Sequence, residues 1–141
     1  MGQWISDDIL DCGLAFIADA GNDWDTHYIS ACSQQPSSAN EALATYLLAK
    51  SEIDLSSVTP EDGDVSGRKI AMPAKADVLV TNGGAATHIA LVGYMLVAGL
   101  PPTNFYLLLY VTTCEELALV EGGLVSFPSW KIEIADPTLP T

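Results

Sequence analysis

The sequence predicts a mainly β fold of the α+β class, an antiparallel β-sandwich or barrel with an N-terminal helix. From Pro60 onward, short apolar or alternating runs follow one another between turn sequences, which is typical of antiparallel sheets. Residues 6–20 instead place apolar side chains at helical spacing. A single domain over residues 1–135, β-rich at 60–135, accommodates both patterns. Residues 136–141 (DPTLPT) contain two prolines and are predicted to form an extended tail.

The helix predicted at residues 6–20 has a defined start and end. Ser6 can cap its first turn, where the helix dipole also favours the carboxylates of Asp7 and Asp8. Gly21 follows as a C-terminal stop. The apolar stripe of this helix consists of Ile9, Leu10, Leu14 and Ile17, with Phe16 beside it.

A short strand and a second amphipathic segment are predicted between the helix and the β-rich part. Residues 27–32 (HYISAC) favour a strand, and residues 34–40 (QQPSSAN) favour a loop. Asn40 or Ser38 could then cap an amphipathic segment at residues 41–50 (EALATYLLAK).

The β-rich part contains strands of two kinds. The last one alternates apolar and charged residues, which predicts one buried face. The strand that contains His88 is largely apolar on both faces, so it should lie centrally in a sheet or meet a partner with its second face. The predicted strands are residues 68–74, 76–82, 86–93, 105–113 and 130–136, with a hairpin around 99–104.

Composition limits the partners of this chain. Eighteen acidic residues against five basic ones give a net charge of −13, so binding to a nucleic-acid backbone is not expected. Charged residues make up 16% of the sequence, against about 25% in typical domains, which predicts a surface that contacts other protein. The apolar runs at 89–100 and 105–111 are each shorter than the roughly 20 residues of a membrane helix, so no membrane span is expected.

No catalytic, cofactor-binding or metal-binding residues are predicted. The strand neighbours of His88 are Ala, Thr and Ile, which offer no nucleophile and no group that would fix its tautomer. We therefore interpret His88 as structural. His27, between Asp25 and Tyr28, is better placed for polar chemistry at the surface, but no residue flanks it at ligand spacing.

The acidic turns and the cysteines also lack the spacing of metal sites. Residues 19–26 and 61–67 combine carboxylates with glycine, but neither matches a calcium-binding loop, and we interpret both as turns. Cys12, Cys32 and Cys114 have no C-x-x-C spacing, which favours buried thiols and leaves one inter-chain disulfide open. We expect no enzymatic activity.

Four stretches stand out along the chain, in the order DGDVSGRKIAMPA, GGAATHIALV, LLYVTTC and FPSWKIEIADPT. Together they resemble a family of small proteins encoded by tailed bacteriophages and prophages. Most members of that family are known only as hypothetical or virion proteins, and the resemblance implies a helix followed by a β domain and a location in the virion. Turn glycines and alternating strand residues carry the likeness.

One segment departs from the family pattern. Where a tight hairpin is expected, residues 93–106 form a longer apolar insertion, GYMLVAGLPPTNFY. So many large apolar groups do not suit a solvated hairpin, which predicts a subunit interface, the alternative being a segment that folds back over the core of its own domain. The predicted interface residues are Met95, Leu96, Val97, Leu100, Pro101, Pro102, Phe105 and Tyr106, with Asp136 and Pro137 of the tail.

Two functions are therefore expected. The first is a non-enzymatic virion structural protein, most concretely a capsid decoration or cement protein that binds itself and the major capsid protein or another virion protein. The alternative is a host-recognition or adhesion module on a head or tail fibre. Adhesion modules expose aromatic side chains in loops, whereas cement proteins bury them between subunits. Trp24 and the loop at residues 99–106 (GLPPTNFY) therefore distinguish the two.

Overall fold

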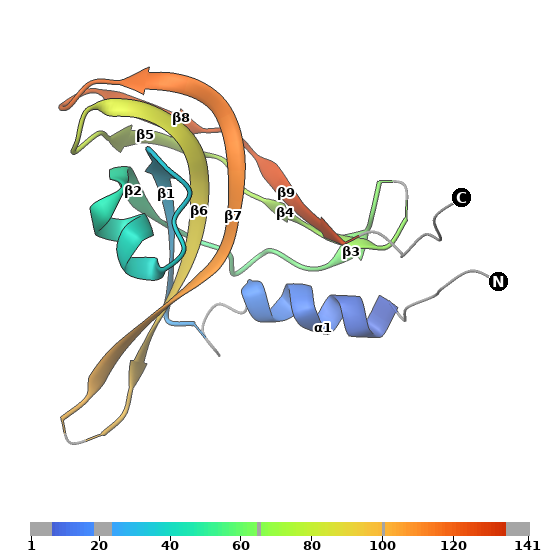
Figure 1. Cartoon of the computed structure of the whole chain (residues 1–141). Coiled ribbons are helices and arrows are strands. Elements are labelled where there is room, and N and C mark those ends of the chain that lie inside the picture. Colours follow the sequence, from blue (N-terminus) through green and yellow to red (C-terminus); the bar gives the residue numbers. More distant parts are fainter. Residues whose placement is uncertain (1–6, 19–23, 65, 100, 135–141) are drawn as a thin grey trace.

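The computed structural model describes residues 7–18, 24–64, 66–99 and 101–134, and it confirms the mainly β fold with antiparallel sheets (Figure 1). Helix α1 (Asp7–Ile17) lies within the range predicted for a helix, and η1 (Glu41–Thr45) is a short π-helix. The predicted tail at 136–141 is outside the described residues. The strands are β1 (Thr26–Cys32), β2 (Leu47–Ile53), β3 (Glu61–Asp62), β4 (Arg68–Met72), β5 (Lys75–Leu79), β6 (Gly84–Val97), β7 (Thr103–Leu119), β8 (Leu124–Phe127) and β9 (Trp130–Ile134).

The main sheet has the strand order β2-β1-β6-β7, with every neighbouring pair antiparallel. Strand β6 is therefore internal, as its two apolar faces predict. On one face, Ile89 and Leu91 pack into the main core, and on the other, Ala90 and Val92 pack into a smaller cluster with Ala42 of η1. Residues 89–92 of β6 are therefore covered on both faces of the sheet by other parts of the same chain.

Two smaller sheets, β3-β4-β9 and β5-β8, complete the core. The end of β5 continues along β2, because the Thr81 amide donates to the Leu48 carbonyl at 2.8 Å. Figure 1 shows β5 and β8 over one end of the main sheet, while β4 and β9 extend away from it above α1. The main core lies between these sheets and includes Leu14, Ile29, Leu55, Ile70, Met72, Val78, Leu91, Phe127 and Ile132.

The C-terminal end of α1 is held by two side chains from the segment that follows it. Carbonyls in the last turn of a helix have no partner within the helix. The Trp24 indole donates from Nε1 to the Phe16 carbonyl at 2.8 Å, and His27 donates from Nε2 to the Ile17 carbonyl at 2.7 Å. The sequence placed His27 nearer the surface than His88, but His27 is only 1% exposed and bonds the helix end.

The amphipathic segment predicted at residues 41–50 is also partly wrong. Only Glu41–Thr45 are helical, whereas Leu47–Ile53 form β2. Leu47, Leu48 and Ala49 are all buried and extended, because pairing with β1 and the packing of Leu48 and Ala49 in the main core outweigh the helical spacing of the local sequence. Strand β8 has no counterpart among the predicted strands, and β6 and β7 are longer than predicted.

A cluster of charges ties the β3-β4-β9 sheet together. Asp64 pairs with Lys69 at 2.5 Å and with Lys131, and its backbone amide donates to the Glu133 carboxylate at 2.7 Å. Hydrogen bonds from Lys131 and Lys69 lower the pKa of Asp64 from 3.8 to about 2. Arg68 of β4 binds Asp11 of α1 at 2.7 Å, which links the helix to the same sheet.

The Asp64 cluster predicts a pH-dependent stability at acid pH. Because folding lowers the pKa of Asp64 from 3.8 to about 2, its stabilising contribution is complete above the higher value and is lost as pH falls towards the lower one. The melting temperature of Asp64→Asn should therefore fall less than that of the unmodified protein when the pH is lowered from 3.8 to about 2. Thermal melts of both proteins across this range measure the effect, with Glu116→Gln as the control, since Glu116 has no ion pair among the described residues. Equal pH slopes for Asp64→Asn and the unmodified protein would contradict this role of Asp64.

Candidate interface: the β6–β7 arm and its groove

Strands β6 and β7 extend past the end of β1 as a hairpin that we call the arm, residues 93–97 and 101–107. Strand β1 still pairs with β6 at the base of the arm, up to Thr26↔Tyr94, and beyond that pair only two strands remain. The pairing within the arm runs from Gly93↔Leu107 to Val97↔Thr103. Figure 1 shows the arm extending away from the rest of the protein rather than folding back over the core. The sheet thus narrows to two strands where the insertion in the sequence lies.

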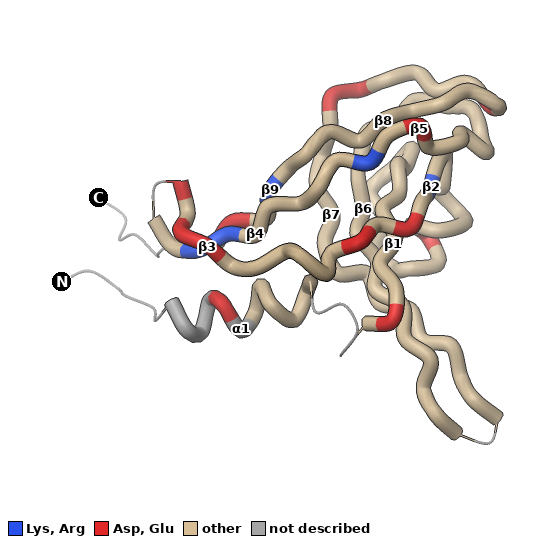
Figure 2. The backbone as a smooth tube through the Cα atoms, turned by 180° about the vertical axis from the view of Figure 1, so that it is seen from behind, with Lys and Arg blue, Asp and Glu red and all other residues tan. Residues whose placement is uncertain are grey.

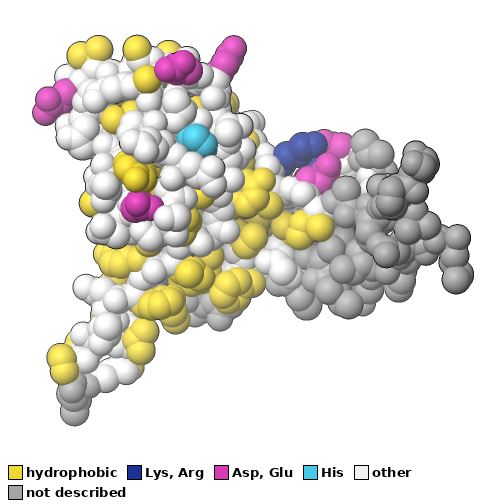
Figure 3. All heavy atoms as spheres, viewed as in Figure 1, with side chains coloured by type: hydrophobic (Ala, Val, Ile, Leu, Met, Phe, Trp, Pro, Cys, Tyr) yellow, Lys and Arg dark blue, Asp and Glu magenta, His cyan; other side chains and the backbone are white. Residues whose placement is uncertain are grey.

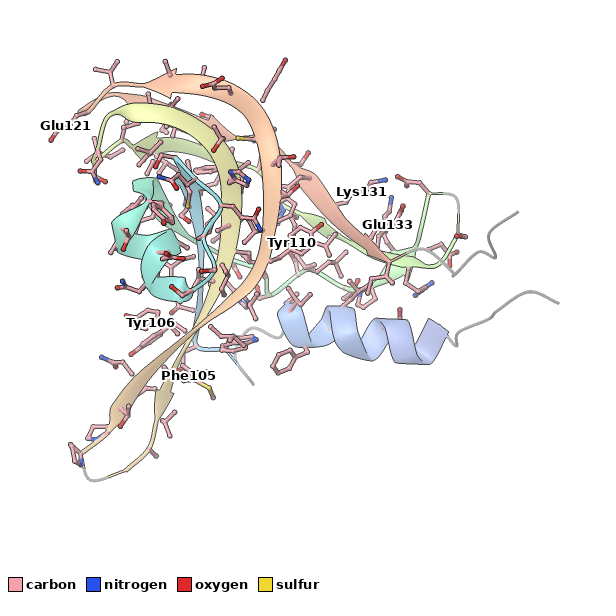
Figure 4. All side chains as sticks on the ribbon, in the orientation of Figure 1. Phe105, Tyr106, Tyr110, Glu121, Lys131 and Glu133 are labelled. Carbon is pink, nitrogen blue, oxygen red and sulfur yellow. The ribbon has the colours of Figure 1, made fainter. Side chains whose placement is uncertain are left out.

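Large apolar side chains of the arm are exposed on both of its faces. Phe105 and Tyr106, adjacent and therefore on opposite faces, are each 43% exposed, and Leu96 is 52% exposed (Figure 4). In Figure 3, hydrophobic side chains gather along the arm and continue across its base towards α1. Of the other predicted interface residues, Val97, Pro101 and Pro102 are exposed, Met95 is half-buried, and Leu100, Asp136 and Pro137 lie outside the described residues.

The base of the arm is fixed by Trp24, which is 2% exposed and lies directly on Gly93. A Cβ atom at Gly93 would lie 2.6 Å from the Trp24 ring and 3.1 Å from Leu109 Cδ1, so only glycine fits there. The Phe16 ring meets the Trp24 ring edge-on, with centroids 5.5 Å apart. Helix α1, Trp24 and the arm therefore form one packed unit, which the sequence analysis did not identify.

Asp25 also holds β6 at the base of the arm. Its backbone amide donates to the Tyr94 carbonyl at 2.8 Å, and its carboxylate accepts a hydrogen bond from the Leu96 amide at 2.8 Å. Across the arm, the Tyr94 and Tyr106 rings lie 4.9 Å apart, and the Tyr94 hydroxyl donates to Asn104 Oδ1 at 2.8 Å. These contacts set the register and direction of the arm.

A groove of about 690 Å³ lies beside the arm, between it and η1. Burial raises the pKa of the Tyr28 phenol, and Glu52, Tyr106 and Tyr94 add to the effect, so Tyr28 remains a neutral donor and acceptor. Aromatic rings, amides, a hydroxyl and one ammonium group together suit a polar ligand that carries little charge. The lining residues are Tyr28, Ser38, Ala39, Asn40, Leu43, Lys50, Asn104, Phe105 and Tyr106.

His88 lies at the end of a short hydrogen-bond chain. The Thr87 hydroxyl donates to the Ser33 carbonyl at 3.1 Å, so it accepts from His88 Nδ1 at 2.9 Å. On the neighbouring strands His88 is paired with Cys32 and Thr113. The contacts of His88 in the described chain are therefore those of a residue within a sheet.

Two cysteine side chains lie among the described residues, those of Cys32 and Cys114. Burial raises the pKa of both the Cys32 and the Cys114 thiols, and both are free, while the Cys12 side chain lies outside the described residues. Within residues 7–18, 24–64, 66–99 and 101–134, no three His, Cys, Asp or Glu side chains gather as metal ligands.

Comparisons with protein-family models, curated proteins and solved structures found no match for this chain. Among the described residues, no helix has the length and apolar character to cross a membrane. The geometry of the arm and the groove is therefore the structural basis for assigning a function.

Gly93→Ala should destabilise the protein, because the added methyl group overlaps the Trp24 ring. Overpacking of this kind typically costs about 1–3 kcal/mol of unfolding free energy. Gly13→Ala is the matched control: nothing lies within 4 Å of its Cβ position, and alanine favours the helix. Chemical denaturation measures both variants. If Gly93→Ala is as stable as the unmodified protein, Trp24 does not anchor the arm in this way.

Proposed function

We propose that this chain is a non-enzymatic structural protein of a bacteriophage particle, a capsid decoration or cement protein that assembles through its arm. The observation that carries this proposal is the exposure of Leu96, Phe105 and Tyr106 on a hairpin whose outer part has only two strands. A two-stranded hairpin is marginally stable in water by itself, and exposed apolar patches are typical of protein contacts. Contact with another protein would therefore stabilise the arm by burying its apolar side chains.

The charge distribution supports the same role. No Asp, Glu, Lys or Arg occurs between Asp77 and Glu115, although the chain carries a net charge of −13. In Figure 2 the whole arm is free of charged residues, which lie on the other elements. Depletion of charge is characteristic of the buried centre of protein interfaces. The bacteriophage origin itself rests on the sequence resemblance.

The double variant Leu96→Ser, Phe105→Ser tests the arm as the assembly surface. Both side chains are exposed, so the variant should melt near the temperature of the unmodified protein and lose self-association at least tenfold in light scattering. Leu79→Ser, Leu124→Ser is the matched control, because these leucines are 54% and 65% exposed away from the arm and should leave association unchanged. Unaltered association of the arm variant, or an unmodified protein that neither self-associates nor binds capsid shells, would contradict the proposal.

The position in the particle is tested separately by electron microscopy. An antibody against this chain should label the outer surface of phage heads. Labelling confined to tails or fibres would contradict a decoration role.

The groove beside the arm supports a second candidate, a host-recognition or adhesion module that binds a glycan. Trp24 is buried against α1, but Tyr28, Asn40 and Tyr106 line the groove, and rings with amides are suited to sugar faces and hydroxyls. For this candidate, the purified chain should bind specific glycans on an array, and Asn40→Ala should lower the signal several-fold without changing the melting temperature. A silent array argues against adhesion.

A further inference from the structure

We propose that the free edge of β7 pairs with the same strand of a second copy. The two strands run antiparallel about a two-fold axis, so that two main sheets become one continuous sheet. This inference rests on the proposed role of the arm in assembly, and it adds the partner and the mode of contact.

One edge of β7 is open in the described part of the chain. Within the main sheet β7 pairs with β6 alone, and no backbone hydrogen bond from its other edge to a described residue is present. Natural sheet edges are normally short or carry charges and prolines that prevent pairing with other chains. Strand β7 is 17 residues long, and its segment from Thr103 to Cys114 contains neither a charge nor a proline.

The backbone groups that face this edge follow from the contacts of Asp25. Asp25 bonds the Tyr94 carbonyl and the Leu96 amide, so these two residues direct their backbone groups towards β1. In an antiparallel ladder, a β6 residue whose backbone groups face β1 lies opposite a β7 residue whose backbone N–H and C=O point away from β6. Tyr94 is opposite Tyr106, and Leu96 is opposite Asn104.

The same alternation includes Leu108. It is paired with Val92, which lies two residues before Tyr94, and a register shift follows between Val92 and Leu91. The regular part of the open edge therefore presents the amides and carbonyls of Asn104, Tyr106 and Leu108. This three-residue pattern is sufficient for a short antiparallel ladder.

A second copy fits this edge better than an unlike partner. An antiparallel strand pair about a two-fold axis is self-complementary, because each copy offers the same donors and acceptors. The copies share a net charge of −13, and the uncharged arm is where they approach without opposing like charges. Pairing would also join the two arms into one sheet, which has four strands beyond the ends of the two β1 strands, with the Tyr94–Tyr106 ring pairs of both copies in one row.

The test compares Asn104→Pro with Asn104→Ala. Both remove the side chain that accepts from Tyr94, but only proline removes the backbone N–H that faces the open edge. Proline is tolerated where that N–H faces away from the neighbouring strand, so both variants should keep the far-ultraviolet circular dichroism spectrum of the unmodified protein. Sedimentation velocity should show a dimer for the unmodified protein and for Asn104→Ala, and at least tenfold weaker association for Asn104→Pro.

Amide hydrogen exchange supplies a second readout on the unmodified protein. On association, the amides of Asn104, Tyr106 and Leu108 should exchange at least tenfold more slowly. Equal exchange in the associated and dissociated protein would overturn edge pairing.

The outcomes separate this inference from the proposed function. If Asn104→Pro associates as Asn104→Ala does while Leu96→Ser, Phe105→Ser is monomeric, edge pairing is overturned and the arm still assembles through its faces. If neither variant changes association, both proposals are overturned. If the unmodified protein is monomeric and Asn104→Pro loses binding only to capsid shells, the pairing strand belongs to a capsid protein and the second copy is overturned as partner.

Discussion

The rest of the structure depends on the long antiparallel ladder between β6 and β7. It runs from Gly84↔Leu119 to Val97↔Thr103 and passes through two environments. In the first, β1 flanks β6 and the chain buries both faces of β6, whereas beyond Tyr94 only β6 and β7 remain. A shift of one residue would turn every side chain of the arm to the opposite face. The packing that fixes the register of this ladder in the core therefore also determines which side chains lie on each face of the arm.

Helix α1 is connected to that ladder through side chains rather than through a sheet. Trp24 bonds the Phe16 carbonyl with its indole and covers Gly93 with its ring, so one residue satisfies the helix end and positions the arm. His27 bonds the next carbonyl, that of Ile17. Buried polar groups of this kind are expensive to leave unpaired, so the helix end and the base of the arm are expected to stay together.

The sequence predicted the parts of the fold that local patterns determine. The apolar faces of β6 and the alternation in β9, where Ile132 is buried and Lys131 exposed, were readable because each residue reports its own surroundings. The burial of His27 could not be predicted in this way, since its polar neighbours in the sequence gave no sign that α1 would cover it. Likewise, Trp24 meets Gly93 across a long stretch of sequence, and the groove combines residues from β1, η1, β2 and β7. Such sites arise from tertiary packing, which a single sequence does not display.

The contrast between an acidic chain and an uncharged arm bears on the proposed association of two copies. At physiological ionic strength, charges repel over about 8 Å, so two acidic surfaces are disfavoured only when they come close. Acidic residues on α1, β3 and the loops therefore disfavour the approach of two copies through those surfaces. The arm has no charge between Asp77 and Glu115, so an approach through the arm is not disfavoured in this way. Repulsion elsewhere and apolar contact at the arm then favour the same orientation. In such an arrangement the net charge contributes to the selectivity of assembly, even though it contributes no attraction.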